Sequence, residues 1–139
     1  MHEQIITRLQ ARLKAYDDLA ETLDEELLNL KIDVPKHKSL AEHLWCVIGA
    51  RESYARALEA GSWAGFACSM QSFSAEDFAS KLKASSSAVD AALANLSDWN
   101  SDRSELLALL AEHEVMHEGQ IIRHMYALER DLPASWFWA

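Results

Sequence analysis

The stretch Leu106–Leu128, with the sequence LLALLAEHEVMHEGQIIRHMYAL, shows the helical period of this chain most clearly and contains its most informative motif. Its apolar residues return every three or four positions, which is the spacing of one face of an α-helix. His113 and His117 fall on that apolar row, four residues apart, so both imidazoles can reach one metal ion. The stretch predicts a long helix that begins at residue 101 or 102, ends before Pro133 and carries a pair of candidate metal ligands.

The same helical period extends over most of the chain. An apolar row from Ile5 to Leu30 predicts one long helix over about residues 3–31. Ser39 and Glu42 match a capping box at the start of a second helix, which we expect to run to about residue 60. Ser74, flanked by apolar residues, predicts the start of a third helix that ends near residue 96.

The connections between these helices have two different characters. The segment 33–38 contains Pro35 and three side chains able to carry positive charge, and we expect a loop. The segment 62–72 has no clear period but is too apolar for a free linker, so we expect an ordered loop packed on the helices. The aromatic residues of the C-terminal tail, 135–138, indicate that this end also docks on a protein surface.

Composition restricts the classes of function. A chain of 139 residues with 50% hydrophobic content is expected to form a single domain over residues 1–139. The net charge of −9 and the lack of a basic run argue against a nucleic-acid partner. No apolar run is long enough to span a membrane, no export signal is apparent, and two cysteines fit a reducing compartment, so we expect a cytoplasmic protein.

Four helices without a strand pattern predict an all-α fold, a four-helix bundle. In such bundles metal sites are built in the core from side chains on facing helices. His43 falls on the apolar row of the second helix and is the third histidine on an inward row, after His113 and His117. Because a buried imidazole needs partners, these three histidines are the predicted metal ligands.

The order and spacing of these residues resemble the DinB/YfiT-like family of putative metalloenzymes over nearly the whole chain. The resemblance rests on His43 early in the second helix, on His113 and His117 in the last, on the step Gly119-Gln120-Ile121 and on Pro133. It implies a divalent metal, nickel or zinc in the first place with iron or manganese as alternatives, and a homodimer. It also implies, for some members, S-transfer with a low-molecular-weight thiol. Arg130 and Asp131 stand where relatives often have glycine before the proline.

The motif His113-Glu114-Val115-Met116-His117 also satisfies the zinc-protease signature, in which the glutamate is a general base. The extended form of that signature fails, because Gly119 and His124 follow the second histidine at the wrong distances. We expect Glu114 to face solvent. His124 lies about 10.5 Å along the helix from His117, which suits the rim of a pocket better than a ligand.

Other residues near the predicted site have weaker signals. Cys46, three residues after His43, could face the site or pack as a small apolar residue. Tyr54 could offer its hydroxyl to a ligand or pack in the core. Ser85 interrupts an apolar row, which indicates either a close helix contact or a gap in the core that forms a pocket. His2 and His37 are assigned no role.

The sequence therefore leads to a functional hypothesis with open alternatives. Three neutral imidazoles would hold a divalent cation with a position left for thiolate or hydroxide, for attack on a small electrophile, as in an S-transferase or hydrolase. Protons should compete with the metal below about pH 6.5. The alternatives are a metal or small-ligand binding protein of stress response and a purely structural metal site.

Overall fold

The computed structural model describes residues 1–139, and its only regular elements are helices, which confirms the predicted all-α class. The helices are α1 (His2–Ala20), α2 (Glu25–Asn29), α3 (Leu40–Ala60), α4 (Ala75–Ala94) and α5 (Ser101–Ala127). None of them combines the length and the apolar character that crossing a bilayer requires.

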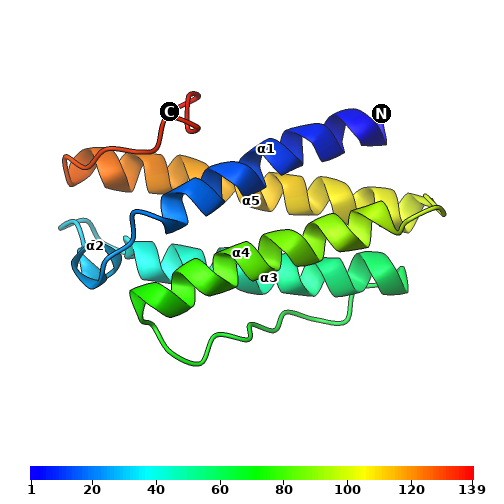
Figure 1. Ribbon diagram of the computed structural model, residues 1–139, viewed down its shortest axis with the longest axis horizontal. Helices are drawn as coiled ribbons and strands as arrows, with labels where there is room; N and C mark the ends of the chain where they lie inside the picture. Colours follow the sequence, from blue (N-terminus) through cyan, green and yellow to red (C-terminus); the bar gives the residue numbers. More distant parts are fainter.

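The four long helices lie side by side (Figure 1). Each of α1 and α3 packs against both α4 and α5, so that α1 and α3 occupy opposite corners of the assembly. Helices α3 and α4 run in one direction while α1 and α5 run in the other (Figure 1). The parallel course of α3 and α4 requires the long connection between them, which returns along the outside of the molecule.

Side-chain caps begin the helices where the sequence predicts them. The hydroxyl of Ser39 accepts a hydrogen bond from the Glu42 backbone N–H, and the Glu42 carboxylate accepts one from the Ser39 N–H, completing the capping box. Ser74 caps α4 in the same way through the Asp77 N–H. Gly61 ends α3 in the left-handed conformation, with φ of 80°.

The prediction of one continuous first helix is wrong. Helix α1 ends at Ala20, and α2 forms a separate short helix. The Thr22 hydroxyl donates to the Leu19 carbonyl, and the Asp24 carboxylate accepts from the Leu27 N–H, so both side chains compete with helix continuation. The apolar row persists across the break because Leu27 and Leu28 are still buried.

Helix α5 begins at Ser101 and ends at Ala127, before Pro133, as predicted. The backbone N–H groups of Glu129 and Arg130 donate to the carbonyls of Tyr126 and Met125, the paired bonds of a Schellman motif. Glu129 takes the left-handed position with φ of 53°, where glycine is the usual residue.

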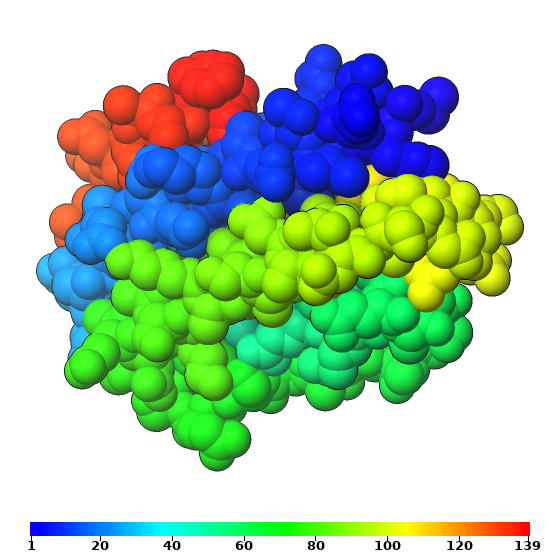
Figure 2. All heavy atoms as spheres, turned by 45° about the vertical axis from the view of Figure 1, so that its right-hand side comes forward, coloured from blue at the N-terminus to red at the C-terminus, as the bar shows by residue number.

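The connection 61–74 is ordered and lies along α3, as expected. A Cβ atom at Gly49 of α3 would come within 2.2 Å of the Phe66 ring and 2.9 Å of Cys68, so glycine permits this close approach. The tail docks as well: Trp136 is buried and its indole N–H donates to the Ala15 carbonyl at 2.8 Å. Figure 2 shows the C-terminal segment in red against α1 in blue.

Two apolar clusters fill the interior, one toward each end of the long helices. The first contains Leu40, Leu44, Ile48, Phe78, Leu82, Ile121 and Met125, and the second Leu9, Leu58, Val89, Leu93, Leu106 and Leu110, among others. On α3, α4 and α5 the residues between the two sets include buried polar side chains: Arg51, Ser85, Ser86, Glu114, His117 and Glu118. We call these six residues the polar layer.

Candidate metal centre

The three predicted histidines meet where α3 faces α5. His43 of α3 and His117 of α5 are both buried, and their Nδ1 atoms are 3.1 Å apart. One turn before His117, His113 stacks obliquely on it, with 4.5 Å between ring centroids. His117 thus lies against both His43 and His113, whereas the group of three mutually close donor atoms contains Cys46 and not His43.

Cys46 joins this group, which the sequence left undecided. Its Sγ atom lies 3.5 Å from Nε2 of His113. Cys46, His113 and His117 each offer a donor atom within 4.8 Å of the others. Cys46 follows His43 by three residues and so shares its helix face, the only sequence signal for this placement.

These separations match those of two ligands on one metal ion. Metal–nitrogen bonds of about 2.0–2.1 Å and a metal–sulfur bond of about 2.3 Å, at tetrahedral angles, place two nitrogens about 3.3 Å apart and a nitrogen and sulfur about 3.6 Å apart. The His43–His117 and Cys46–His113 distances are close to these values. The other nitrogens of the two rings, Nε2 of His117 and Nδ1 of His113, are buried and have no hydrogen-bond partner. They are alternatives to the facing atoms, because one imidazole binds a given ion through a single nitrogen.

Burial sets the protonation state of the group. Desolvation lowers the pKa of His43 to about 4, with a further contribution from the charge of Lys38. Desolvation and the neighbouring His113 lower the pKa of His117 to about 3, and the pKa of His113 is also lowered by burial. All three imidazoles are therefore neutral near pH 7, the form that binds a metal. Burial raises the pKa of the Cys46 thiol, which is therefore protonated near pH 7.

The expectation that Glu114 faces solvent is wrong. Glu114 is fully buried and accepts two hydrogen bonds from Arg51, Nε–Oε1 at 2.7 Å and Nη2–Oε2 at 2.8 Å. Arg51 is also fully buried, and its Nη1 donates to the Ser86 hydroxyl at 3.0 Å. The buried face of α5 is wider than the row of histidines and includes Glu114. Its partner, Arg51, follows Val47 by four residues on the inward row of α3, and the sequence analysis did not identify it. A carboxylate held in this fork is unsuited to act as the general base of a zinc protease.

A second carboxylate next to the histidines is also paired. Glu118 is buried and accepts a hydrogen bond from Arg12 of α1 at 2.7 Å. The Arg12 guanidinium lies 3.9 Å from the centre of the Trp138 ring in the docked tail. Desolvation, opposed by Arg12, raises the pKa of Glu118 to about 7. The tail thus covers the ion pair that neighbours His117.

The remaining histidines are more ordered than the sequence suggests. His124 is buried, and its Nδ1 lies 2.8 Å from Nε2 of His37, the two rings stacking 5.1 Å apart. His37, which was assigned no role, thereby fixes the loop before α3 to α5. His2 forms a hydrogen bond with Ser104 near the start of α5 and stacks on Trp99, away from His113 and His117.

Two other candidates have structural contacts instead. The Ser85 hydroxyl donates to the Leu82 carbonyl of its own helix and the residue is buried, which fits the close-packing alternative. Tyr54 stacks on Trp63 of the long connection, which fits packing.

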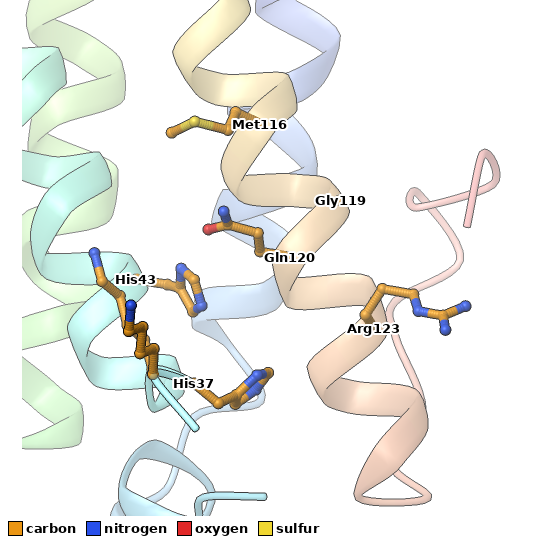
Figure 3. Close-up of a pocket in the computed structure, with 8 residues that line it drawn as sticks. His37, His43, Met116, Gly119, Gln120 and Arg123 are labelled. Carbon is orange, nitrogen blue, oxygen red and sulfur yellow. The ribbon is translucent and has the colours of Figure 1, made fainter. Parts of the chain in front are cut away.

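A pocket of about 450 Å³ opens beside His43. Its walls come from the loop before α3 (Lys36, His37 and Lys38) and from α5 (Met116, Gly119, Gln120 and Arg123). His43 and Gln120 point toward one another across it (Figure 3). The predicted ligand His43 therefore borders a space that a small molecule can enter.

Comparisons of the chain with protein-family models, with curated proteins and with solved structures give no match.

Proposed function

We propose that this chain is a metal-dependent enzyme of the DinB/YfiT-like type, a four-helix bundle that holds one divalent ion through His43, His113 and His117. The observation that carries the proposal is the contact of the neutral His117 imidazole with both His43 and His113, with the Cys46 sulfur beside His113. Three protein ligands with an exchangeable fourth position are typical of catalytic zinc sites. Nickel and zinc both accept imidazole and thiolate donors, so either suits this set.

The fourth position gives Cys46 a specific role. At rest its sulfur, 3.5 Å from His113, is placed to occupy that position. A bound ion would supply the acidity that makes a thiol or water a nucleophile for attack on a small electrophile. Cys46, whose pKa is raised by burial, would be the group that accepts the proton of an incoming thiol.

Metal content of the purified, untagged protein tests the ligand set. His43→Ala, His113→Ala and His117→Ala should each bind less than about a tenth of the wild-type metal at limiting concentration, since mutation of even a residue that only supports a ligand costs 10–100-fold. His2→Ala is the matched control, because His2 pairs with Ser104, and both it and His37→Ala should keep full metal. Equal metal content in all five variants would refute the proposed centre.

Cys46→Ser separates a catalytic from a structural site. We expect this variant to keep its metal and to lose, in the cobalt-substituted protein, the thiolate-to-metal absorption band of the resting state. A small thiol added to the variant should restore such a band. Loss of metal from Cys46→Ser would instead indicate a closed four-ligand centre, and the proposal of thiol or water activation would fall. Sedimentation of the same samples tests the homodimer that the resemblance implies.

A further inference from the structure

The pocket beside His43 has an unusual charge for this molecule. The chain has 13 Lys and Arg residues against a net charge of −9, and seven of these cations form ion pairs. Lys36, Lys38 and Arg123, which line the pocket, are among those that form none. Unpaired positive charge is therefore gathered at one opening of an acidic protein.

Only part of this charge is directed at the cavity. The Arg123 side chain extends away from His43 (Figure 3). Lys38 is close enough that its charge lowers the pKa of His43, His113 and His117 alike. The two lysines of the loop before α3 are thus the groups able to hold a negative charge near the histidines.

The backbone at Lys36 adds an independent observation. The His37 N–H donates to the Val34 carbonyl at 3.1 Å, closing a turn with Pro35 and Lys36 at its centre. Lys36 has φ of 64°, the left-handed position of a type II turn that glycine normally occupies. A lysine is strained there, and such strain is typical of residues kept for a functional reason. The His37–His124 contact fixes this turn against α5.

The opposite wall leaves room for a ligand. Gly119 lies inside α5, where glycine weakens a helix, yet a Cβ atom there would meet nothing within 4 Å. Packing therefore gives no reason for glycine at this position. Next to it, Gln120 points into the pocket and offers an amide that can donate to an anionic oxygen (Figure 3).

We propose that this pocket binds a small molecule bearing a carboxylate or phosphate group, which Lys36 and Lys38 hold at the mouth while the rest of the molecule reaches toward His43. The assignment of the other end of that molecule as a thiol or an electrophile rests on the proposed metal function. The anionic end does not, because its contacts come from the loop and from Gln120.

The test titrates succinate and methyl phosphate into metal-free protein and follows backbone amide NMR shifts. Saturable shifts confined to residues 36–38 and 116–123 are expected, and whichever anion binds more tightly identifies the group. Lys36→Gly with Lys38→Gln should weaken binding at least about fivefold, the scale of two exposed charge contacts. Lys81→Gln on α4 removes the same kind of charge outside the pocket and should change nothing.

Lys36→Gly alone gives a second readout. Because glycine relieves the strained turn, this variant should melt at the same or a higher temperature while binding the anion more weakly. The proposal is overturned if neutral succinamide binds as well as succinate, or if the double variant keeps wild-type affinity. Metal content and anion binding are also measured together on the wild type and on the histidine variants. If the histidine variants lose metal and still bind the anion, both proposals are supported. If the wild type binds the anion but no metal, only the proposed metal function is refuted.

Discussion

At the scale of single residues, burial of titratable groups should determine how the metal-free protein responds to acid. The pKa of His43 is lowered to about 4 and that of His117 to about 3, below the value of about 6.5 for a free histidine. Between these values the unfolded chain binds protons that the folded state does not, so stability falls as the pH drops below about 6.5 and keeps falling toward about 4. Urea unfolding at a series of pH values measures this slope.

Protonation of Glu118 stabilises the folded state on acidification, opposite to the effect of the two histidines, over part of the same pH range. Its pKa is raised to about 7, so the folded state binds a proton that the unfolded state does not, and acidification from about pH 7 to about 4.5 favours folding through this group. We expect the two histidines to outweigh it. His43→Asn and His117→Asn should each flatten the acid slope, His2→Asn should not, and identical slopes in all three would contradict the depressed histidine pKa values.

The lowered pKa values of His43 and His117 also change the pH range in which metal binding should weaken. Competition by protons was expected below about pH 6.5, the range of free histidine. In Cys46→Ser, where no thiol proton is lost on binding, the already neutral imidazoles should keep the affinity level down to about pH 5, and it should weaken below the lowered pKa values. Isothermal titration with zinc between pH 7 and 4 distinguishes the two windows.

The histidines were predictable from sequence but the charged residues around them were not. Spacing along one helix places His113 and His117 together, and the position of His43 on an apolar row brings it to the same interior. Glu114 was misassigned because a glutamate on a helix is normally solvated, and only a partner on another helix changes that. Arg51 is this partner, 63 residues away in sequence, and no local pattern relates the two.

At the scale of helices, ends were predictable wherever a local cap defines them. Ser39 with Glu42, Gly61 and Ser74 act within three residues of themselves, so sequence is sufficient. The break after Ala20 was missed because the apolar row continues through α2, and periodicity does not distinguish one helix from two that share a face. The end of α5 before Pro133 was predicted, but its exact residue has no glycine signal, because Glu129 takes the place usually held by glycine.

Glu129→Gly should therefore stabilise the protein. A non-glycine residue in the left-handed conformation costs about 1–2 kcal/mol, and the extra freedom of glycine in the unfolded chain offsets part of this. We expect the free energy of unfolding to rise by about 0.5–1 kcal/mol, measured by urea denaturation. Glu129→Ala keeps the strain and should give no gain; an equal gain in both variants would assign the effect to the lost charge.

At the scale of the whole molecule, the polar layer separates two apolar clusters, and His117 of the candidate metal centre belongs to this layer. All-helical architecture followed from the period of the sequence, but the layer did not, because it depends on how far α3, α4 and α5 are shifted along one another. The fork between Arg51 and Glu114 ties α3 to α5 at this level, one residue from His113. A bidentate pair has one good geometry, so it can fix the shift of one helix along the other.

Variants of the Arg51–Glu114 pair should affect the free energy of unfolding and metal affinity differently. Arg51→Met leaves the Glu114 carboxylate buried without a partner and should lower the free energy of unfolding by about 3–5 kcal/mol. Glu114→Leu leaves the Arg51 guanidinium buried without its carboxylate and should have a cost of the same size, about 3–5 kcal/mol. The double variant Arg51→Met/Glu114→Leu removes both charges and should recover most of that loss, a coupling that a double-mutant cycle measures.

If the pair serves to hold α5 in its place along α3, the recovered double variant should still bind metal more weakly than wild type, because apolar packing tolerates a small sliding of α5 that separates His43 from His117. Metal affinity and urea stability measured on the same sample decide the point. A double variant with wild-type stability and wild-type affinity would show that the two apolar clusters alone position the histidines.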